Sequence, residues 1–154
     1  MKTLACVLMA LSFSAPLLAA DPFVGTWKLD VAKSTYQKGQ APKDTTVVVV
    51  EQGENAVVTV KGTAADGTPI AIKYSVSTKG GTQAYTEGAP PSGVSVTTKR
   101  ANTTTIDATT TMNGKILSTV HTTLSADGKT MTQVRKGVNA TGASVDATII
   151  YTRQ

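Results

Sequence analysis

Side chains that could carry out catalysis are scarce in this chain. His121, in the stretch STVHTTLS, is the only histidine, and Cys6, close to the N-terminus, is the only cysteine. A zinc site needs three or four such ligands, so the usual ligand sets cannot be assembled. No serine follows the pattern of a nucleophile elbow, and no pair of carboxylates has a spacing that suggests acid–base catalysis. The sequence therefore predicts no enzyme, no metal site and no bound cofactor.

Arg100 is the one charged residue that the strand pattern turns inward, on the same side as Val94, Val96 and Thr98. A buried guanidinium needs a partner, and the anionic head of a bound ligand would be one. Arg100 also stands at the last position of its predicted strand, where a long side chain reaches water at the rim of the fold. The rim is the interpretation that we favour, and a ligand contact is the alternative.

The first 20 residues have the pattern of a secretory signal peptide. Lys2 precedes an almost wholly apolar run over 4–18, which ends in Ala19-Ala20 before Asp21. Such a pattern predicts cleavage after residue 20 and a periplasmic or secreted protein, with an uncleaved anchor as the alternative. No later stretch approaches the ~20 apolar residues of a membrane-spanning helix, so no membrane span is expected. The remainder, 21–154, has the length of one domain and contains no cysteine.

The charge of the chain gives little support for nucleic-acid binding. It has 15 basic residues, Lys2 included, and 10 acidic residues. The lysines are spread along the chain, with no block of like charge and no basic stripe interleaved with aromatic residues. We therefore expect a solvated surface and no nucleic-acid partner.

Alternation of apolar and polar residues predicts an all-β fold. Threonine and valine, which favour strands, dominate residues 21–154. In PIAIKYSVS (69–77) every second residue is apolar or aromatic, and 103–112 and 143–152 repeat this pattern of a half-buried strand. The predicted strands are 23–31, 44–51, 56–64, 69–78, 82–87, 93–100, 103–112, 115–125, 130–138 and 143–152.

Short connections between these strands favour a barrel. Asn113-Gly114 and Asp127-Gly128 supply the positive φ angles that tight hairpins need. The single longer connection, 32–43, contains Gly-Gln and Ala-Pro breaks that argue against a long helix. Because tight turns suit a meander better than Greek-key crossovers, we predict an antiparallel up-and-down β-barrel of about 8–10 strands, with a β-sandwich as the alternative.

The only tryptophan, Trp27, stands early, in FVGTWKLD (23–30). A first strand with Gly-x-Trp, followed by a Thr/Val-rich meander, resembles the calycins, the group of the lipocalins and the fatty-acid-binding proteins. FVGTWKL is similar to the start of the fatty-acid-binding proteins, and ATIIYTRQ (147–154) is similar to their last strand. The resemblance implies a minimal, secreted, bacterial lipocalin-like barrel domain over 21–154.

In the calycins the tryptophan closes the floor of the barrel, and a basic residue from a late strand lies over it. The resemblance thus implies a structural role for Trp27, with Arg153 or Arg135 over its ring. Fatty-acid-binding proteins also hold the ligand's carboxylate with the tyrosine of the last strand and an arginine two residues before it. Tyr151 matches that tyrosine, and Ile149 takes the place of the arginine. Their two-helix lid has no counterpart, since the connection after the first strand is too short.

The predicted inner face of the barrel has many small side chains and few bulky ones. A barrel of this size can hold one small ligand unless large side chains fill it. We predict the binding or transport of a small hydrophobic molecule in contact with Tyr74, Ile72, Ile106, Tyr151, Ile149 and Arg100. The alternative is that the barrel flattens and fills itself, because protein cores normally pack well.

The stretch TTVVVVE (45–51) is apolar on both faces, unlike a strand with one wet face. A bare strand of this kind is an aggregation hazard, so two of its valines need a cover outside the barrel, either Val48 and Val50 or Val47 and Val49. We expect segment 32–43 to fold back as that cover, with Tyr36 on the valines; a homodimer or a protein partner is the alternative. The alternative function is then a self-filled barrel that acts through 45–51 as an envelope interaction or inhibitor module.

Overall fold

The computed structural model describes residues 20–154, which contain twelve β-strands and no helix. The predicted signal peptide lies outside the described residues, apart from Ala20. The strands are β1 (Gly25–Leu29), β2 (Thr35–Tyr36), β3 (Asp44–Gln52), β4 (Asn55–Thr63), β5 (Pro69–Ser77), β6 (Gly80–Thr82), β7 (Ala84–Glu87), β8 (Val94–Asn102), β9 (Thr105–Met112), β10 (Lys115–Leu124), β11 (Thr130–Gly137) and β12 (Ala147–Arg153).

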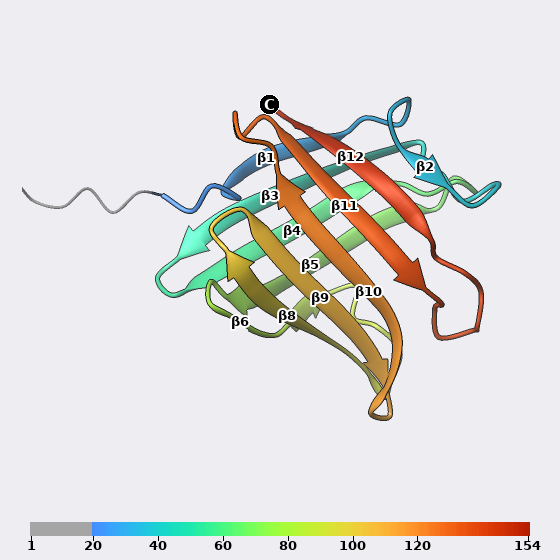
Figure 1. Ribbon diagram of the computed structural model, residues 1–154. Coiled ribbons are helices and arrows are strands. Elements are labelled where there is room, and N and C mark those ends of the chain that lie inside the picture. The colour runs from blue at the N-terminus through green and yellow to red at the C-terminus, as the bar shows by residue number, and fades with distance from the viewer. Residues whose placement is uncertain (1–19) are drawn as a thin grey trace, which may run out of the picture.

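Antiparallel pairing joins these strands into one sheet that curls into a nearly closed barrel (Figure 1). The order is β6-β8-β9-β10-β11-β12-β1-β3-β4-β5-β7, with β2 paired to β12 outside this path. Sequential neighbours pair from β8 to β12 and from β3 to β5, and β1 connects the two runs because it pairs with both β12 and β3. The predicted antiparallel up-and-down barrel is confirmed.

The barrel closes through residues 80–87, of which 82–87 were predicted as a single strand. The structure divides the segment into β6, which pairs with β8, and β7, which pairs with β5. These are the two ends of the sheet order, so this short segment crosses from one edge of the sheet to the other. Between them, the Gln83 amide donates to the Val96 carbonyl at 2.8 Å.

The last strand begins at Ala147 and not at residue 143. Asn139 is responsible, since its side-chain oxygen accepts hydrogen bonds from the amides of Thr141 and Ala143, both at 3.0 Å. An asparagine that satisfies the backbone two and four residues ahead holds a turn in place of a strand. The chain therefore loops between β11 and β12 before the ladder resumes.

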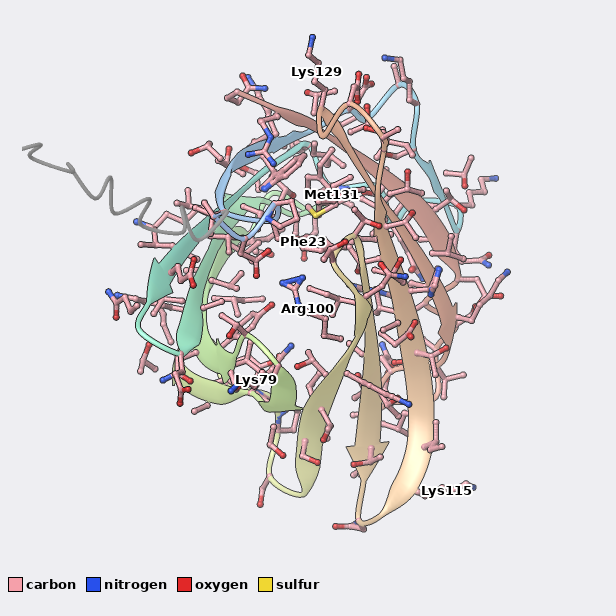
Figure 2. The ribbon with its side chains drawn as sticks, turned by 60° about the vertical axis from the view of Figure 1, so that its left-hand side comes forward. Phe23, Lys79, Arg100, Lys115, Lys129 and Met131 are labelled. Carbon is pink, nitrogen blue, oxygen red and sulfur yellow. The ribbon has the colours of Figure 1, made fainter. Side chains whose placement is uncertain are left out.

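The buried core lies toward the end of the barrel where the N-terminal segment enters β1. Trp27 is fully buried, between Val47 of β3 and Arg153 of β12 in the strand register. In Figure 2 the two ends of the barrel are marked by Lys129, near Phe23 and Met131, and by Lys115 at the opposite end. The core consists of Phe23, Trp27, Leu29, Val47, Val49, Val58, Leu124, Met131, Ile149 and Tyr151.

The valine-rich strand has one buried and one outer face, but the expected cover is wrong. Val47 and Val49 point into the core, whereas Val50 on the outer face is 46% exposed. Tyr36 belongs to β2, which pairs with β12 at Ala147. In the sheet order β12 is separated from β3 by β1. The 32–43 segment folds back as expected but extends a different strand, because the backbone of β12 is left unpaired where β1 ends.

Close approach of β3 and β4 makes Gly62 a sensitive position. A Cβ atom there would lie 2.3 Å from the Asp44 carbonyl oxygen and 2.8 Å from the Thr45 Cα, both backbone atoms that cannot turn away. Gly62→Ala should therefore lower the free energy of unfolding by about 1–3 kcal/mol, as overpacking does. Urea denaturation measures this, with the exposed Lys61→Ala as the control. Equal stability of the two variants would contradict the contact.

Candidate ligand-binding cavity

The interior of the barrel contains an open cavity of about 470 Å³. It extends from Asp21 and Arg100 at the Trp27 end to Pro91 and Val145 at the other. Most of the strand residues that line it alternate along their strands, as inward-facing residues do. The exceptions are the neighbours Val76 and Ser77 on β5, and Leu117 and Ser118 at a bulge of β10. They are Val47, Val49, Ala56, Val58, Val60, Ile72, Tyr74, Val76, Ser77, Gly80, Tyr85, Val94, Val96, Thr98, Arg100, Ile106, Ala108, Thr110, Leu117, Ser118, Val120, Thr122, Met131, Gln133, Arg135 and Tyr151.

The two sides of the cavity differ in chemistry. The side formed by β3, β4 and β5 is lined mainly by aliphatic residues and Tyr74. The side formed by β8 to β11 carries most of the polar groups, which are Thr98, Arg100, Thr110, Ser118, Thr122, Gln133 and Arg135. A cavity with an apolar wall and a few convergent polar groups suits a molecule that is mostly apolar with one polar end.

The floor of the barrel is a stack of Trp27 and Arg153. The guanidinium carbon of Arg153 lies 4.2 Å from the centre of a Trp27 ring. Arg153 also donates hydrogen bonds to the carbonyls of Gly128 at 2.8 Å, Val24 at 2.7 Å and Pro22. The indole Nε1 donates to the Phe23 carbonyl at 2.9 Å. Of the two arginines that the calycin resemblance offered, the structure thus places Arg153 over the tryptophan.

The Gly-x-Trp pattern has a direct physical reason in this stack. Gly25 has a φ of 138°, and a Cβ atom at this residue would lie 2.6 Å from Nη1 of Arg153. Gly25 and Trp27 are two residues apart on β1, so their positions share a face of the strand. Position 25 must therefore hold a small residue. A side chain at position 25 would displace the guanidinium that covers Trp27.

Arg100 points into the barrel opening beside Phe23, between β3–β5 and β9–β11 (Figure 2). It forms an ion pair with Asp21, and its Nε donates to the Thr78 carbonyl at 2.9 Å. Its guanidinium carbon lies 5.2 Å from the centre of the Phe23 ring. The side chain lines the cavity and is 20% exposed. Protein groups from the N-terminal segment already satisfy its charge.

Tyrosine hydroxyls are buried in and around the cavity. Burial raises the pKa of Tyr151 to about 12, with Tyr36 adding to the rise and Arg135 opposing it. Burial also raises the pKa of Tyr74 well above its ordinary value, with Tyr85 and Tyr151 adding to the effect. The Tyr74 and Tyr85 rings lie 5.3 Å apart at 42°. These hydroxyls remain neutral donors at any physiological pH.

The raised tyrosine pKa values predict alkaline unfolding. Above about pH 10 the unfolded chain releases these protons while the folded barrel retains them, so stability falls as the pH rises. Each such tyrosine should lower the free energy of unfolding by up to about 1.4 kcal/mol per pH unit between its unfolded and folded pKa values. Urea denaturation at about pH 9 and about pH 11 measures the slope. Tyr74→Phe should make it shallower, and an unchanged slope would contradict the assignment.

Not every predicted ligand contact lines the cavity. Tyr74, Ile72, Ile106 and Tyr151 do, whereas Ile149 is 5% exposed and packs in the core outside the lining. Ile149 faces inward as its strand parity predicts, but it packs in the same hydrophobic core as Trp27 and does not border the cavity.

Several polar or aromatic lining residues were missed from the sequence, among them Arg135, Gln133 and Tyr85. Arg135, which the resemblance offered as a floor residue, lines the cavity together with Gln133 on β11. The alternation of Met131, Gln133 and Arg135 along the strand is the signal that would have placed them inside. Tyr85 also lines the cavity, and its hydroxyl donates to Gln83 at 2.6 Å.

His121 lies on the outer face of β10, as its strand parity predicts. Its Nδ1 is 2.6 Å from a carboxylate oxygen of Asp107 on β9, and both side chains are about half exposed. Residues 20–154 contain no cluster of three or more side chains suited to hold a metal. They also contain no helix of the length and hydropathy needed to cross a membrane.

Comparison with solved structures shows the barrel fold. The structure of EF1p2_mFAP2b bound to DFHBI has a TM-score of 0.51 and 17% sequence identity, over 88% of this chain and 97% of that one. A redesigned β-barrel, mFAP1, bound to DFHBI, has a TM-score of 0.47 and 16% identity, over 88% and 98% of the two chains. No family model matches the chain, and no curated protein matches it.

Proposed function

We propose that this barrel binds a small, largely apolar molecule in its interior. The observation that carries the proposal is the cavity of about 470 Å³ with its apolar wall on β3, β4 and β5. Sites for small molecules typically occupy ~300–1,000 Å³ and combine apolar lining with a few polar groups. The similar barrel EF1p2_mFAP2b was solved with DFHBI bound, which agrees with the capacity of such a fold to hold a ligand.

A more specific proposal is a lipocalin-like carrier that is periplasmic or secreted and performs no chemistry on its ligand. The Trp27–Arg153 stack fits what the calycin resemblance implied for the barrel floor. The signal-peptide pattern of the first 20 residues supports a periplasmic or secreted location. Expression of the full chain in a bacterium, followed by fractionation and intact mass measurement, tests it. A periplasmic protein that begins at Asp21 is expected. A cytoplasmic protein that retains its first 20 residues would contradict the proposed location.

Titration with the neutral fluorophore phenylnaphthylamine tests the binding function. The fluorophore should bind with one-to-one stoichiometry and fluoresce more strongly, because the cavity shields it from water. Non-fluorescent apolar molecules of similar size should displace it, and high salt should leave its affinity unchanged since the probe has no charge. Fluorescence that rises linearly without saturation would contradict an internal site.

The outer face of β3 supports a second candidate, self-association. Val50 is 46% exposed and pairs across the strands with the apolar Val57 of β4. Two copies could cover this patch by packing face to face, as uncovered apolar strands tend to do. Sedimentation of the protein and of Val50→Lys tests it. A dimer that the substitution converts to a monomer supports this second function, and a monomer at high concentration excludes it.

A further inference from the structure

The three arginines of the chain differ in how their charges are satisfied. Arg153 donates to three backbone carbonyls and stacks on Trp27. Arg100 pairs with Asp21 and donates to the carbonyls of Thr78 and Thr103. Within residues 20–154, Arg135 has neither a hydrogen bond nor an ion pair, and its Nε is the one buried side-chain nitrogen or oxygen without a hydrogen-bond partner.

Arg135 lines the cavity with a partly buried side chain. It lies on β11 and pairs in register with Val120 on one side and Ala147 on the other. Neither neighbour offers a polar side chain to the guanidinium. The next residue, Lys136, points outward and pairs with Asp146. On β11, the outward Lys136 therefore has a carboxylate partner, whereas the inward Arg135 has none within residues 20–154.

Two tyrosines lie near enough to Arg135 to sense its charge, and one of them, Tyr151, lines the same cavity. The positive charge of Arg135 acts on Tyr36 and Tyr151, opposing the rise in pKa that burial causes in each. Tyr36 lies in the same row of the sheet as Arg135, with only the small Ala147 between them. A guanidinium and a neutral phenol that line one cavity favour an oxyanion as ligand, because both groups donate hydrogen bonds.

We propose that the ligand is an apolar molecule with a single oxyanion head, which Arg135 binds inside the barrel. The inference rests on the proposed binding function and specifies the chemical class of its ligand. The planar fork of an arginine matches two oxygens of a carboxylate or sulfonate, and burial strengthens the pairing. The head lies at Arg135 and the apolar body along Val58, Ile72 and Val76 on the facing wall.

This site differs from the clamp that the calycin resemblance suggested. That clamp needs an arginine at position 149 of β12, where the chain has the buried Ile149. Arg135 stands on the adjacent strand β11, whose residue Gln133 is the register partner of Ile149. The cation therefore reaches the cavity from another strand and from a level nearer the end opposite Trp27.

A matched pair of probes tests the inference. Anilinonaphthalene sulfonate and phenylnaphthylamine have the same rings and differ in the sulfonate. Arg135→Met should weaken binding of the sulfonate probe at least about tenfold and change binding of the neutral probe by less than about twofold. Lys136→Met is the matched control, since it removes the same charge from the outer face one residue away, and it should leave both affinities unchanged.

The outcomes separate the inference from the proposed function. Equal weakening of both probes, or no effect on the sulfonate probe, would overturn the role of Arg135 while leaving the cavity as a binding site. Failure of both probes to bind the unmodified protein would overturn the binding function itself. Arg135→Gln is measured in parallel, so that the ratio of the two affinities can be taken from whichever variant retains its circular dichroism spectrum.

Discussion

Trp27→Ala should lower the free energy of unfolding by about 3–5 kcal/mol, the range for removing a buried tryptophan. Trp27 is fully buried and lies at the centre of the core. Its loss would leave a cavity, remove the hydrogen bond to the Phe23 carbonyl, and leave the Arg153 guanidinium without the ring that it covers. For a single domain of this size, a change of that magnitude is a large fraction of the total stability.

Chemical denaturation followed by circular dichroism measures the effect, with Trp27→Phe as the matched control. Phenylalanine keeps an aromatic ring under Arg153 but loses the indole N–H, so a smaller decrease than that of Trp27→Ala is expected. A Trp27→Ala protein within about 1 kcal/mol of the unmodified chain would show that the floor of the barrel is not a structural element.

Ala108→Trp should abolish binding of apolar molecules while the barrel stays folded. Ala108 lines the cavity at the middle of β9, between Thr98 of β8 and Val120 of β10. An indole at this position enters the empty space, which leaves too little room for a ligand. We expect the affinity for phenylnaphthylamine to fall at least about 100-fold, or about 3 kcal/mol. Stability should change much less, because the added ring fills a cavity and does not displace packed atoms.

The matched control for Ala108→Trp is Thr119→Trp. Thr119 is exposed on the outer face of the adjacent strand β10, where a tryptophan adds the same apolar surface without entering the barrel. This variant should bind the probe as the unmodified protein does. If both variants bind normally, the probe must occupy the surface, and the interior site is wrong.

Most of the barrel follows from local patterns. The alternation in 69–77 places Ile72 and Tyr74 on the inner face of β5, as the sequence predicts, because a strand turns successive side chains to opposite sides. The Asn113-Gly114 turn joins β9 to β10, and Asn113 has the positive φ of 50° that such a hairpin turn needs. These features depend on neighbours in the chain and can be predicted without a structure.

The remaining features depend on residues that are distant in sequence. The division of 80–87 into β6 and β7 is imposed by the two sheet edges that the segment has to join. The ion pair of Arg100 brings together residues 79 positions apart, which no strand pattern reveals. Strand parity could have turned Arg135 inward, but only the structure shows that no protein group satisfies its charge within residues 20–154.

Native mass spectrometry of the protein purified from a bacterial periplasm, before and after organic extraction, tests most directly whether the barrel holds an apolar ligand. A bound mass of a few hundred daltons should be present, be lost on extraction, and be replaced when an apolar compound with an acidic head is added. Its accurate mass would also identify the class of the ligand. A bare protein that takes up neither acidic nor neutral apolar compounds would contradict the binding function.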